Sequence, residues 1–242
     1  MFFYAGSVFY LVYAAVYLLA SILPACILLR YIYRKDTIEK EPAGLLLALI
    51  LRGIAAALCA SVLEVVGQKV LDLAVGQDHP YYTVFMAFFV VAAVEEGMKY
   101  YFLKKTTWHD RNFDYLFDGV VYAVFISLGF AAFENISYVF TYGLGVALPR
   151  AVLAIPGHMG FAVFMGIHYG RARLCENQGR AFARRLNLIL GYVSAVFLHG
   201  FYDSCAMIGS GLSMTVFVLF VIVMYIAVYK MIKRQSRADR PI

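Results

Sequence analysis

The chain has 242 residues and a formal net charge of +6, yet only 15% of its residues are charged and 63% are hydrophobic. A soluble globular domain is about 45–50% apolar and about 25% charged, so this composition excludes an ordinary soluble domain and indicates a polytopic membrane protein. The positive charge indicates basic loops that face the cytoplasm, and no nucleic-acid partner is expected.

The four cysteines, Cys26, Cys59, Cys175 and Cys205, are scattered and show no paired spacing. They are therefore predicted to be reduced packing residues rather than disulfides or a zinc knuckle. Residues 1–9 carry no basic side chain, and the first apolar run is too long for the core of a cleavable signal peptide. We expect this segment to remain as the first membrane span.

Seven apolar runs are long enough to cross a bilayer as helices. They lie at approximately 3–29, 44–66, 82–103, 116–141, 149–170, 187–208 and 212–232. None alternates with the period of a strand, and in lipid only helices and closed barrels satisfy the backbone. The sequence therefore predicts an all-α bundle of about seven transmembrane helices in a single membrane domain, residues 1–242, with a tight joint at residues 209–211.

The orientation of this bundle follows from its lysines and arginines. Seventeen of them fall in alternate loops and in the C-terminal tail, whereas only Lys69 and Arg150 fall on the other side. Cytoplasmic loops carry the excess of basic residues in membrane proteins. We therefore predict that the N-terminus lies outside the cell and the C-terminus in the cytoplasm, and that the basic loops bind anionic lipids.

The third span carries three charged residues, Glu95, Glu96 and Lys99. An ionisable group at membrane depth is costly, and it marks a functional site by default. Glu95 and Lys99 are four residues apart, so they share a helix face and can pair, while Glu96 points about 100° away. A buried ion pair that fixes helix packing is the structural alternative, but two glutamates favour a general base or acid.

The fourth span carries Glu134, Asn135 and Tyr138, with Glu134 and Tyr138 on one helix face. Asn135 has the alternative role of joining two helices by a hydrogen bond. A lone glutamate about three-quarters of the way along a span is harder to explain as a helix-joining residue. We therefore expect Glu134 to belong to the same site as the charges of the third span.

The fifth and sixth spans supply two histidines, His158 and His199. Asp203 follows His199 by four residues, a spacing that suits two ligands of one metal or an aspartate that orients the histidine. Taken singly, either histidine has an alternative role as a hydrogen-bonded packing residue. Four consecutive spans nevertheless carry such groups at similar depth, which predicts a polar cavity formed by the helices of approximately residues 82–208.

These motifs, in this order, resemble the PrsW family, whose members are intramembrane proteases grouped with the CAAX-protease and bacteriocin-processing superfamily. The resemblance rests on Glu-Glu-x-x-Lys, Phe-Glu-x-x-x-Tyr, an isolated histidine and His-x-x-x-Asp over residues 90–205. It implies a multi-pass protein of a bacterial cell membrane that cleaves a membrane-anchored protein, such as an anti-sigma factor. It also implies that the catalytic residues are Glu95, Glu96, Glu134, His158, His199 and Asp203.

Two mechanisms fit this set of residues. In one, His158, His199 and either Asp203 or Glu134 hold a zinc ion, and Glu95 or Glu96 deprotonates a bound water. In the other, a glutamate activates water without a metal, while the histidines and Asn135 stabilise the oxyanion and protonate the leaving amine. The chain has no HExxH motif that would require zinc, and we expect no committed metal.

The depths of these residues predict an active site that opens to the outer half of the membrane. Lys99 is expected to keep one glutamate ionised, and Tyr138 to support Glu134. The alternative function is an ion- or proton-coupled transporter that uses the same carboxylates and histidines. Transporters often contain inverted repeats and broken helices in matching halves, and the sequence shows neither.

Overall fold

The computed structural model describes residues 2–242, and the surroundings of the side chains from Leu11 onward. Helices make up most of the described chain, as predicted. Their bounds are α1 (Phe2–Lys35), α2 (Ala43–Ala74), α3 (Tyr82–Phe85), η1 (Met86–Ala92), α4 (Ala93–Thr107), α5 (Asp118–Tyr142), η2 (Leu144–Val146), α6 (Ala147–Val152), α7 (Ala154–Asn177), α8 (Ala181–Ile208) and α9 (Gly211–Arg237).

Six of the seven expected spans are confirmed as helices long and apolar enough to cross a membrane. Within the described residues these are 11–35, 43–74, 118–142, 144–177, 181–208 and 211–237. The predicted joint between the last two is also present. Gly209 adopts a left-handed backbone with φ +62°, and the Ser210 side chain accepts a hydrogen bond from the backbone of Ser213 to begin α9.

The remaining expected span, 82–103, is helical from Tyr82 to Thr107 but does not have the composition of a lipid-exposed helix. Its middle part, η1, is a π-helix of seven residues. Any 18 consecutive residues of this helical path include Glu95, Glu96 and Lys99, which exceeds the charge expected of a span. All three side chains are buried, because η1 packs on α8 while α4 packs on α2 and α5.

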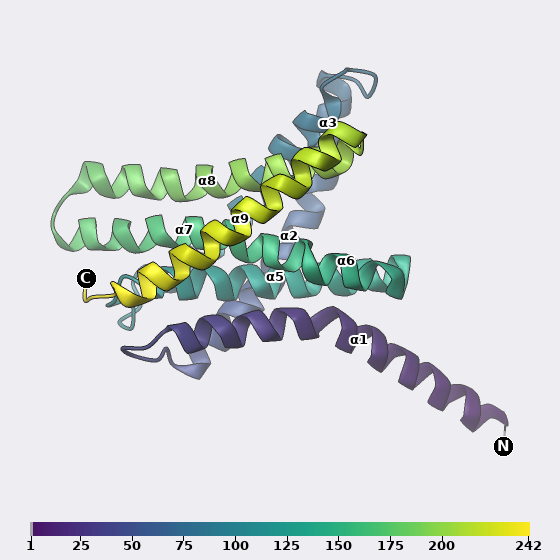
Figure 1. Ribbon diagram of the computed structural model, residues 1–242, viewed down its shortest axis with the longest axis horizontal. Coiled ribbons are helices and arrows are strands. Elements are labelled where there is room, and N and C mark those ends of the chain that lie inside the picture. The colour runs from purple at the N-terminus through teal and green to yellow at the C-terminus, as the bar shows by residue number, and fades with distance from the viewer. Residues whose placement is uncertain (1) are drawn as a thin grey trace.

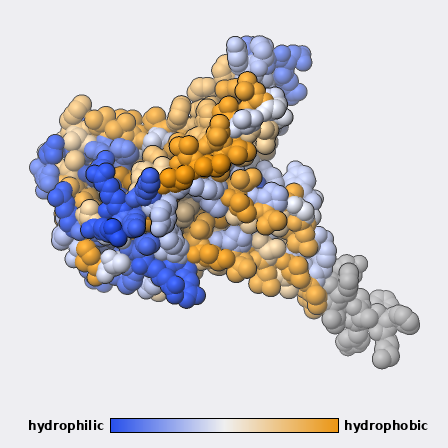
Figure 2. Space-filling view, in the orientation of Figure 1, coloured by the Kyte–Doolittle hydropathy of each residue, from blue (hydrophilic) through white to orange (hydrophobic). Residues whose placement is uncertain are grey.

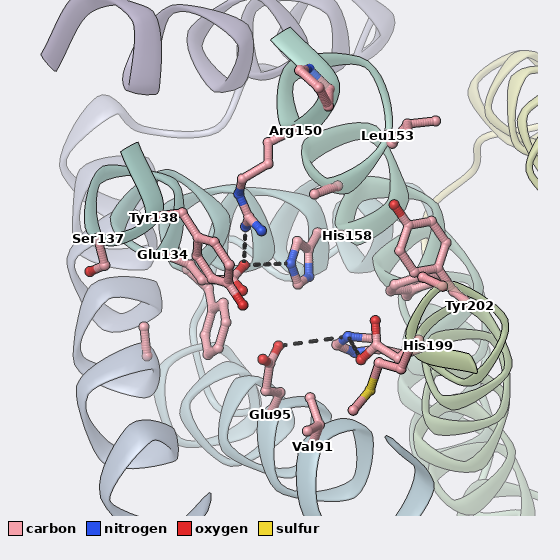
Figure 3. Close-up of a pocket in the computed structure, with 18 of the residues that line it drawn as sticks. Val91, Glu95, Glu134, Ser137, Tyr138, Arg150, Leu153, His158, His199 and Tyr202 are labelled. Atoms are coloured by element: carbon pink, nitrogen blue, oxygen red, sulfur yellow. Dashed lines mark hydrogen bonds and ion pairs between the residues drawn. The ribbon is translucent and has the colours of Figure 1, made fainter. Parts of the chain in front are cut away.

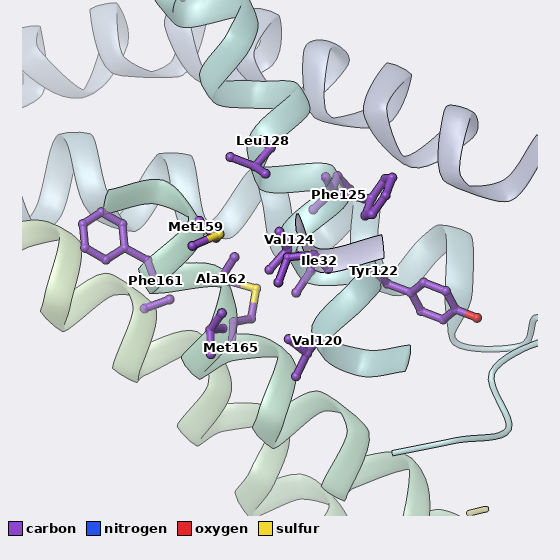
Figure 4. Close-up of a cluster of buried hydrophobic side chains, with 14 of the residues drawn as sticks. Ile32, Val120, Tyr122, Val124, Phe125, Leu128, Met159, Phe161, Ala162 and Met165 are labelled. Atoms are coloured by element: carbon purple, nitrogen blue, oxygen red, sulfur yellow. The ribbon is translucent and has the colours of Figure 1, made fainter. Parts of the chain in front are cut away.

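Helix α5 is the centre of the bundle. Every residue from Asp118 to Ala131 is buried, as expected of a helix that is covered on all sides. Its side chains pack with those of α7 and with Ile32 of α1 (Figure 4). Helices α5, α7 and α8 run side by side, and α9 crosses them (Figure 1).

Helix α2 crosses α5 at a contact between backbones. A Cβ atom added to Gly53 would lie 2.1 Å from the carbonyl oxygen of Ile126, and one added to Gly129 would lie 2.5 Å from that of Ile50. Only glycine permits this approach, and small residues are the usual means by which helices pack closely in membranes. This crossing sets the position of α2 at the side of the cavity described below.

Hydrophilic residues gather at one end of the molecule, at the left of Figure 2, where the C-terminus and the α1–α2 and α7–α8 connections lie (Figure 1). The C-terminal segment is hydrogen-bonded there. Leu116 donates to the carbonyl oxygen of Arg240, Ile242 to that of Asp114, and the Ser236 hydroxyl to that of Lys35. The structure thus places the basic loops together, while their assignment to the cytoplasm stays a prediction.

Candidate active site

A cavity of about 670 Å³ lies among α2, η1, α4, α5, α6, α7, α8 and α9. The predicted site residues in its lining are Glu95, Glu134, Tyr138, His158, His199 and Asp203. Glu95 and His199 face Glu134 and His158 across the open space (Figure 3). The structure therefore brings side chains from four predicted spans to one cavity, and Glu96 lies next to it, completely buried.

Lys99 is the centre of a buried ionic cluster. Its Nζ lies 3.0 Å from Glu95 Oε2 and 2.8 Å from Glu96 Oε1, and 3.9 Å from the ring centroid of Phe130. The predicted contact with Glu95 is present, and Glu96 joins it from the next position on the helix. One lysine thus compensates two carboxylates that would otherwise be unpaired in a medium that solvates charge poorly.

His199 connects α4 with α8. Its Nδ1 lies 2.9 Å from Glu96 Oε1, and its Nε2 lies 3.2 Å from Asp203 Oδ2 and 3.9 Å from Glu95 Oε2. The predicted contact between His199 and Asp203 is therefore present. The ring of Phe161 stacks on the imidazole, with centroids 4.8 Å apart and an interplanar angle of 18°, and so limits its rotation.

Close packing of η1 against α8 places His199 beside the two glutamates. A Cβ atom on Gly200 would lie 2.5 Å from a ring carbon of Phe88. Only a glycine after His199 allows the π-helical segment to approach this closely. π-Helical turns are frequent at functional sites, and here the turn directly precedes the helix that carries both glutamates.

His158 has a defined hydrogen-bonding state. Its Nδ1 lies 3.1 Å from Lys99 Nζ and its Nε2 lies 3.0 Å from Glu134 Oε2. An ammonium only donates and an ionised carboxylate only accepts. Nδ1 is therefore the acceptor, and Nε2 carries the proton that it donates to Glu134. Ser127 fixes the backbone here by donating a hydrogen bond to the His158 carbonyl oxygen at 3.0 Å.

Arg150 of α6 is a site residue that the sequence reasoning missed. Its Nη2 lies 2.9 Å from Glu134 Oε2, and its guanidinium carbon lies 3.8 Å from the ring centroid of Tyr138. Its Nε donates to Asn135 Oδ1 at 2.9 Å. The available signal was an arginine in an otherwise apolar segment, which was counted only as a loop charge.

Asn135 does not line the cavity, in contrast to Tyr138, the other supporting residue predicted on α5. Its amide donates a hydrogen bond to the backbone oxygen of Ser21 at 2.8 Å, while its oxygen accepts from Arg150. Both ends of the side chain are thus engaged away from the space where a substrate would lie. This geometry favours a role in joining α1, α5 and α6, which is the helix-joining alternative.

Four residues could together hold a metal ion. Glu95, Glu96, His158 and His199 each offer a ligand atom, and these atoms all lie within 4.8 Å of one another. Nitrogen and carboxylate donors of this kind suit zinc. Glu134 and Asp203, expected as candidate ligands, instead contact the Nε2 atoms of the two histidines, where carboxylates commonly orient metal-binding imidazoles.

The donor set therefore fits a divalent ion, with one further requirement. Lys99 Nζ lies within 3.1 Å of Glu95, Glu96 and His158, three of the four candidate ligands. An ammonium and a dication repel each other, so the lysine has to turn away when a metal binds. One Glu96 oxygen, Oε2, is buried and has no partner among the described residues, which leaves it free to act as a ligand.

The sequence profile of the PrsW family intramembrane metalloproteases matches residues 41–229. This chain belongs to the PrsW family. It is similar to Protease PrsW of Oceanobacillus iheyensis, with 33% identity over 88% of this chain and 93% of the relative. It is also similar to those of Clostridioides difficile, with 30% identity over 86% of each chain, and Bacillus subtilis, with 30% identity over 76% and 79%.

No solved structure matches this chain. Membership in the PrsW family, together with helices able to span a membrane, makes the chain a peptidase and a multi-pass protein of a bacterial cell membrane. The family relationship predicted from the four motifs is thereby confirmed.

Proposed function

We propose that this PrsW-family chain hydrolyses a peptide bond of a membrane-anchored protein within the cavity formed by α4, α5, α7 and α8. The observation that carries the proposal is the contact of Glu95 with both Lys99 and His199 at the wall of that cavity. It places a carboxylate paired with a lysine, an imidazole and room for a polypeptide segment together. An anti-sigma factor as the natural substrate stays a prediction.

Glu95 is the proposed base, because it lines the cavity while Glu96 is completely enclosed. Glu95 takes a proton from a water molecule, the water oxygen attacks the carbonyl carbon, and the carbon–nitrogen bond then breaks. His199 lies 3.9 Å from Glu95 through its Nε2, so it is placed to return a proton to the leaving amine. Glu96 acts through His199, which it holds from the other ring nitrogen.

The oxyanion formed in this reaction needs hydrogen-bond donors that face the cavity. His158 is not free for this role, since its two nitrogens face Lys99 and Glu134. Arg150 and Tyr202 both line the cavity and carry such donors. We therefore assign the stabilisation of the oxyanion to these two side chains and not to Asn135.

The family's description as metalloproteases adds a second form of the mechanism. Glu95, Glu96, His158 and His199 would hold the ion, and Glu134 and Asp203 would orient the two histidines. A zinc ion supplies Lewis acidity and lowers the pKa of a water that it binds. In either form, substrate positioning and proton return to the amine remain with the side chains of this chain.

The cavity is lined towards its α6 side by Pro149 and Arg150, and by Met207 and Met214 where α8 turns into α9. Helix α6 and the junction of α8 with α9 lie at the end of the bundle opposite the basic loops (Figure 1). If those loops are cytoplasmic, as the positive-inside rule predicts, the substrate is cut near its outer juxtamembrane segment. Mass spectrometry of the products locates the cut, and a cytoplasmic scissile bond would contradict this proposal.

The test of the function uses the full chain in proteoliposomes with a single-span reporter protein. We expect Glu95→Gln and His199→Ala each to lower the cleavage rate by at least about a hundredfold, while Glu39→Gln, in the exposed α1–α2 connection, has no effect. Circular dichroism verifies that each variant is folded. Full cleavage by both site variants would reject this site, and no observation favours the transporter alternative.

A further inference from the structure

One carboxylate in the cavity wall, that of Glu64 on α2, plays no part in the mechanism above. Glu64 lines the same cavity as Glu95 and Glu134. Its Oε1 is buried and has no hydrogen-bond partner among the described residues. The side chain as a whole is half-buried, but a buried oxygen left without a hydrogen-bond partner is unfavourable, which suggests that its partner arrives with a ligand.

The other carboxylates of the lining differ from Glu64 in this respect. Each has a nitrogen partner within the protein, as follows: Glu95 has Lys99, Glu134 has His158 and Arg150, and Asp203 has His199. Glu64 makes no hydrogen bond or ion pair with the other described residues. Glu64 is therefore the carboxylate of the cavity that is free to bind a donor from outside the protein.

The charge of the cavity indicates that this donor is a cation. Four carboxylates but only one guanidinium line it, and the adjacent Glu96 is paired with Lys99. A cavity with this excess attracts positively charged ligands.

The other residues of the cavity wall indicate which kind of cation fits beside Glu64. Glu64 is outside the compact group of four metal donors, and a second metal ion would need more oxygen ligands than Glu64 offers. Much of the wall is apolar, including Phe133, Met214 and Phe217. A lysine or arginine side chain has an apolar stem and a cationic head, and it matches both features of this wall.

We propose that Glu64 binds the cationic head of a lysine or arginine of the substrate and thereby selects substrates with a basic residue close to the scissile bond. This inference rests on the proposed proteolysis and deepens it by naming a feature of the substrate. Glu64 is a specificity residue in this proposal and takes no part in proton transfer.

The first experiment measures kcat/KM in proteoliposomes for synthetic single-span peptides. A lysine, a glutamine or a norleucine replaces each position of the segment around the cut in turn. We expect one position at which lysine is preferred over norleucine by about thirtyfold, as for a desolvated charge pair. Glu64→Gln should abolish this preference without changing the rate for the norleucine peptide, and Glu39→Gln should retain it.

The second experiment does not depend on turnover. The same peptides are made with a non-cleavable hydroxyethylene group at each peptide bond of the scanned segment in turn, labelled with fluorescein, and titrated with the protein by fluorescence anisotropy. Wild type should bind the lysine peptide about thirtyfold more tightly than the norleucine peptide, and Glu64→Gln should bind the two equally. The Tm of unliganded Glu64→Gln should equal or exceed that of wild type, because the buried Oε1 has no hydrogen-bond partner that the substitution would remove.

The outcomes separate this inference from the proposed function. If wild type cleaves no peptide yet shows the lysine preference in binding, the proposed proteolysis fails and the role of Glu64 stands. If cleavage occurs with no basic preference at any position, or if Glu64→Gln retains that preference, the inference is overturned. A Tm several degrees lower in Glu64→Gln also overturns it, since Glu64 would then have a structural partner.

Discussion

His199 Nδ1 lies 2.9 Å from Glu96 Oε1, although the two residues are 103 positions apart and lie on different helices, α8 and α4. Glu96 also lies 2.8 Å from Lys99. The second glutamate of the pair is thus the point where the ionic cluster of α4 meets the histidine of α8. Because of this contact, substituting Glu96 on α4 changes the charge beside His199 on α8.

Removing the lysine from this cluster should destabilise the protein severely. Lys99→Met leaves Glu95 and Glu96 buried without their cation, and breaking a buried ion pair costs about 3–5 kcal/mol. We expect a large fall in Tm, measured in detergent by circular dichroism. The exposed Lys105→Met serves as the control.

A triple variant with Lys99→Met, Glu95→Gln and Glu96→Gln identifies the cause of that loss. Removing all the charges together should recover much of the Tm, because no carboxylate is left unpaired. An unchanged Tm in Lys99→Met alone would contradict the cluster as described.

Metal content provides a second prediction. In the metal form of the mechanism, Glu95, Glu96, His158 and His199 should hold one zinc ion per chain, measured by mass spectrometry of the purified protein. Glu96→Gln should lower the zinc occupancy, and Asp203→Asn should weaken binding by about 10–100-fold, since Asp203 contacts His199 Nε2. Full cleavage activity after chelation, with no zinc bound, would instead establish the metal-free mechanism.

The crossing of α2 over α5 should not tolerate a larger residue. In Gly53→Ala the new Cβ would lie 2.1 Å from the Ile126 carbonyl oxygen, and overpacking of this kind costs about 1–3 kcal/mol. Gly44→Ala, on the same helix, is a matched control because no atom lies within 4 Å of its Cβ. We expect a lower Tm for Gly53→Ala only, and equal Tm values for both variants would contradict this packing.

The connection between α1 and α2 should make stability depend on pH. Burial raises the pKa of Glu41 to about 7, from an ordinary value near 4.5. The folded state therefore holds this proton more tightly than the unfolded state. The contribution of Glu41 to the free energy of unfolding is complete below about pH 4.5. It is lost as the pH rises through about 7.

Glu41→Gln tests this dependence, because glutamine does not titrate. The Tm of wild type should fall between about pH 5 and about pH 8, and the fall should be smaller in Glu41→Gln. Glu39 lies in the same connection and is exposed, so Glu39→Gln should behave as wild type. Asp36 contributes in the same direction, because burial raises its pKa to about 6.

Hydrophobic runs predicted most of the fold, since a length of about twenty apolar residues is a strong signal for a membrane helix. The π-helical segment Met86–Ala92 gave no such signal, because periodicity of apolar residues cannot reveal one inserted residue in a helix that is apolar on all faces. The single domain of residues 1–242, and the cytoplasmic side of the basic loops, stay predictions.

Contacts within one helix were predictable and contacts between helices were not. Spacing alone predicted that Glu95 meets Lys99 and that His199 meets Asp203, and both contacts are present. That His158 joins Glu134 to Lys99 depends on how α4, α5 and α7 pack. The role of Arg150 was not predictable for the same reason, because it depends on contacts with Tyr138 and Glu134 of another helix.

The charged helix Tyr82–Thr107 has a consequence for how the protein is made. Glu95, Glu96 and Lys99 at membrane depth oppose insertion of an isolated helix by about 2.5–3.5 kcal/mol for each charged residue. The histidine that contacts Glu96 belongs to α8, which is synthesised later. We therefore expect this segment to settle into the bilayer only when the later helices arrive, so that the active site and the transmembrane topology are completed in the same step.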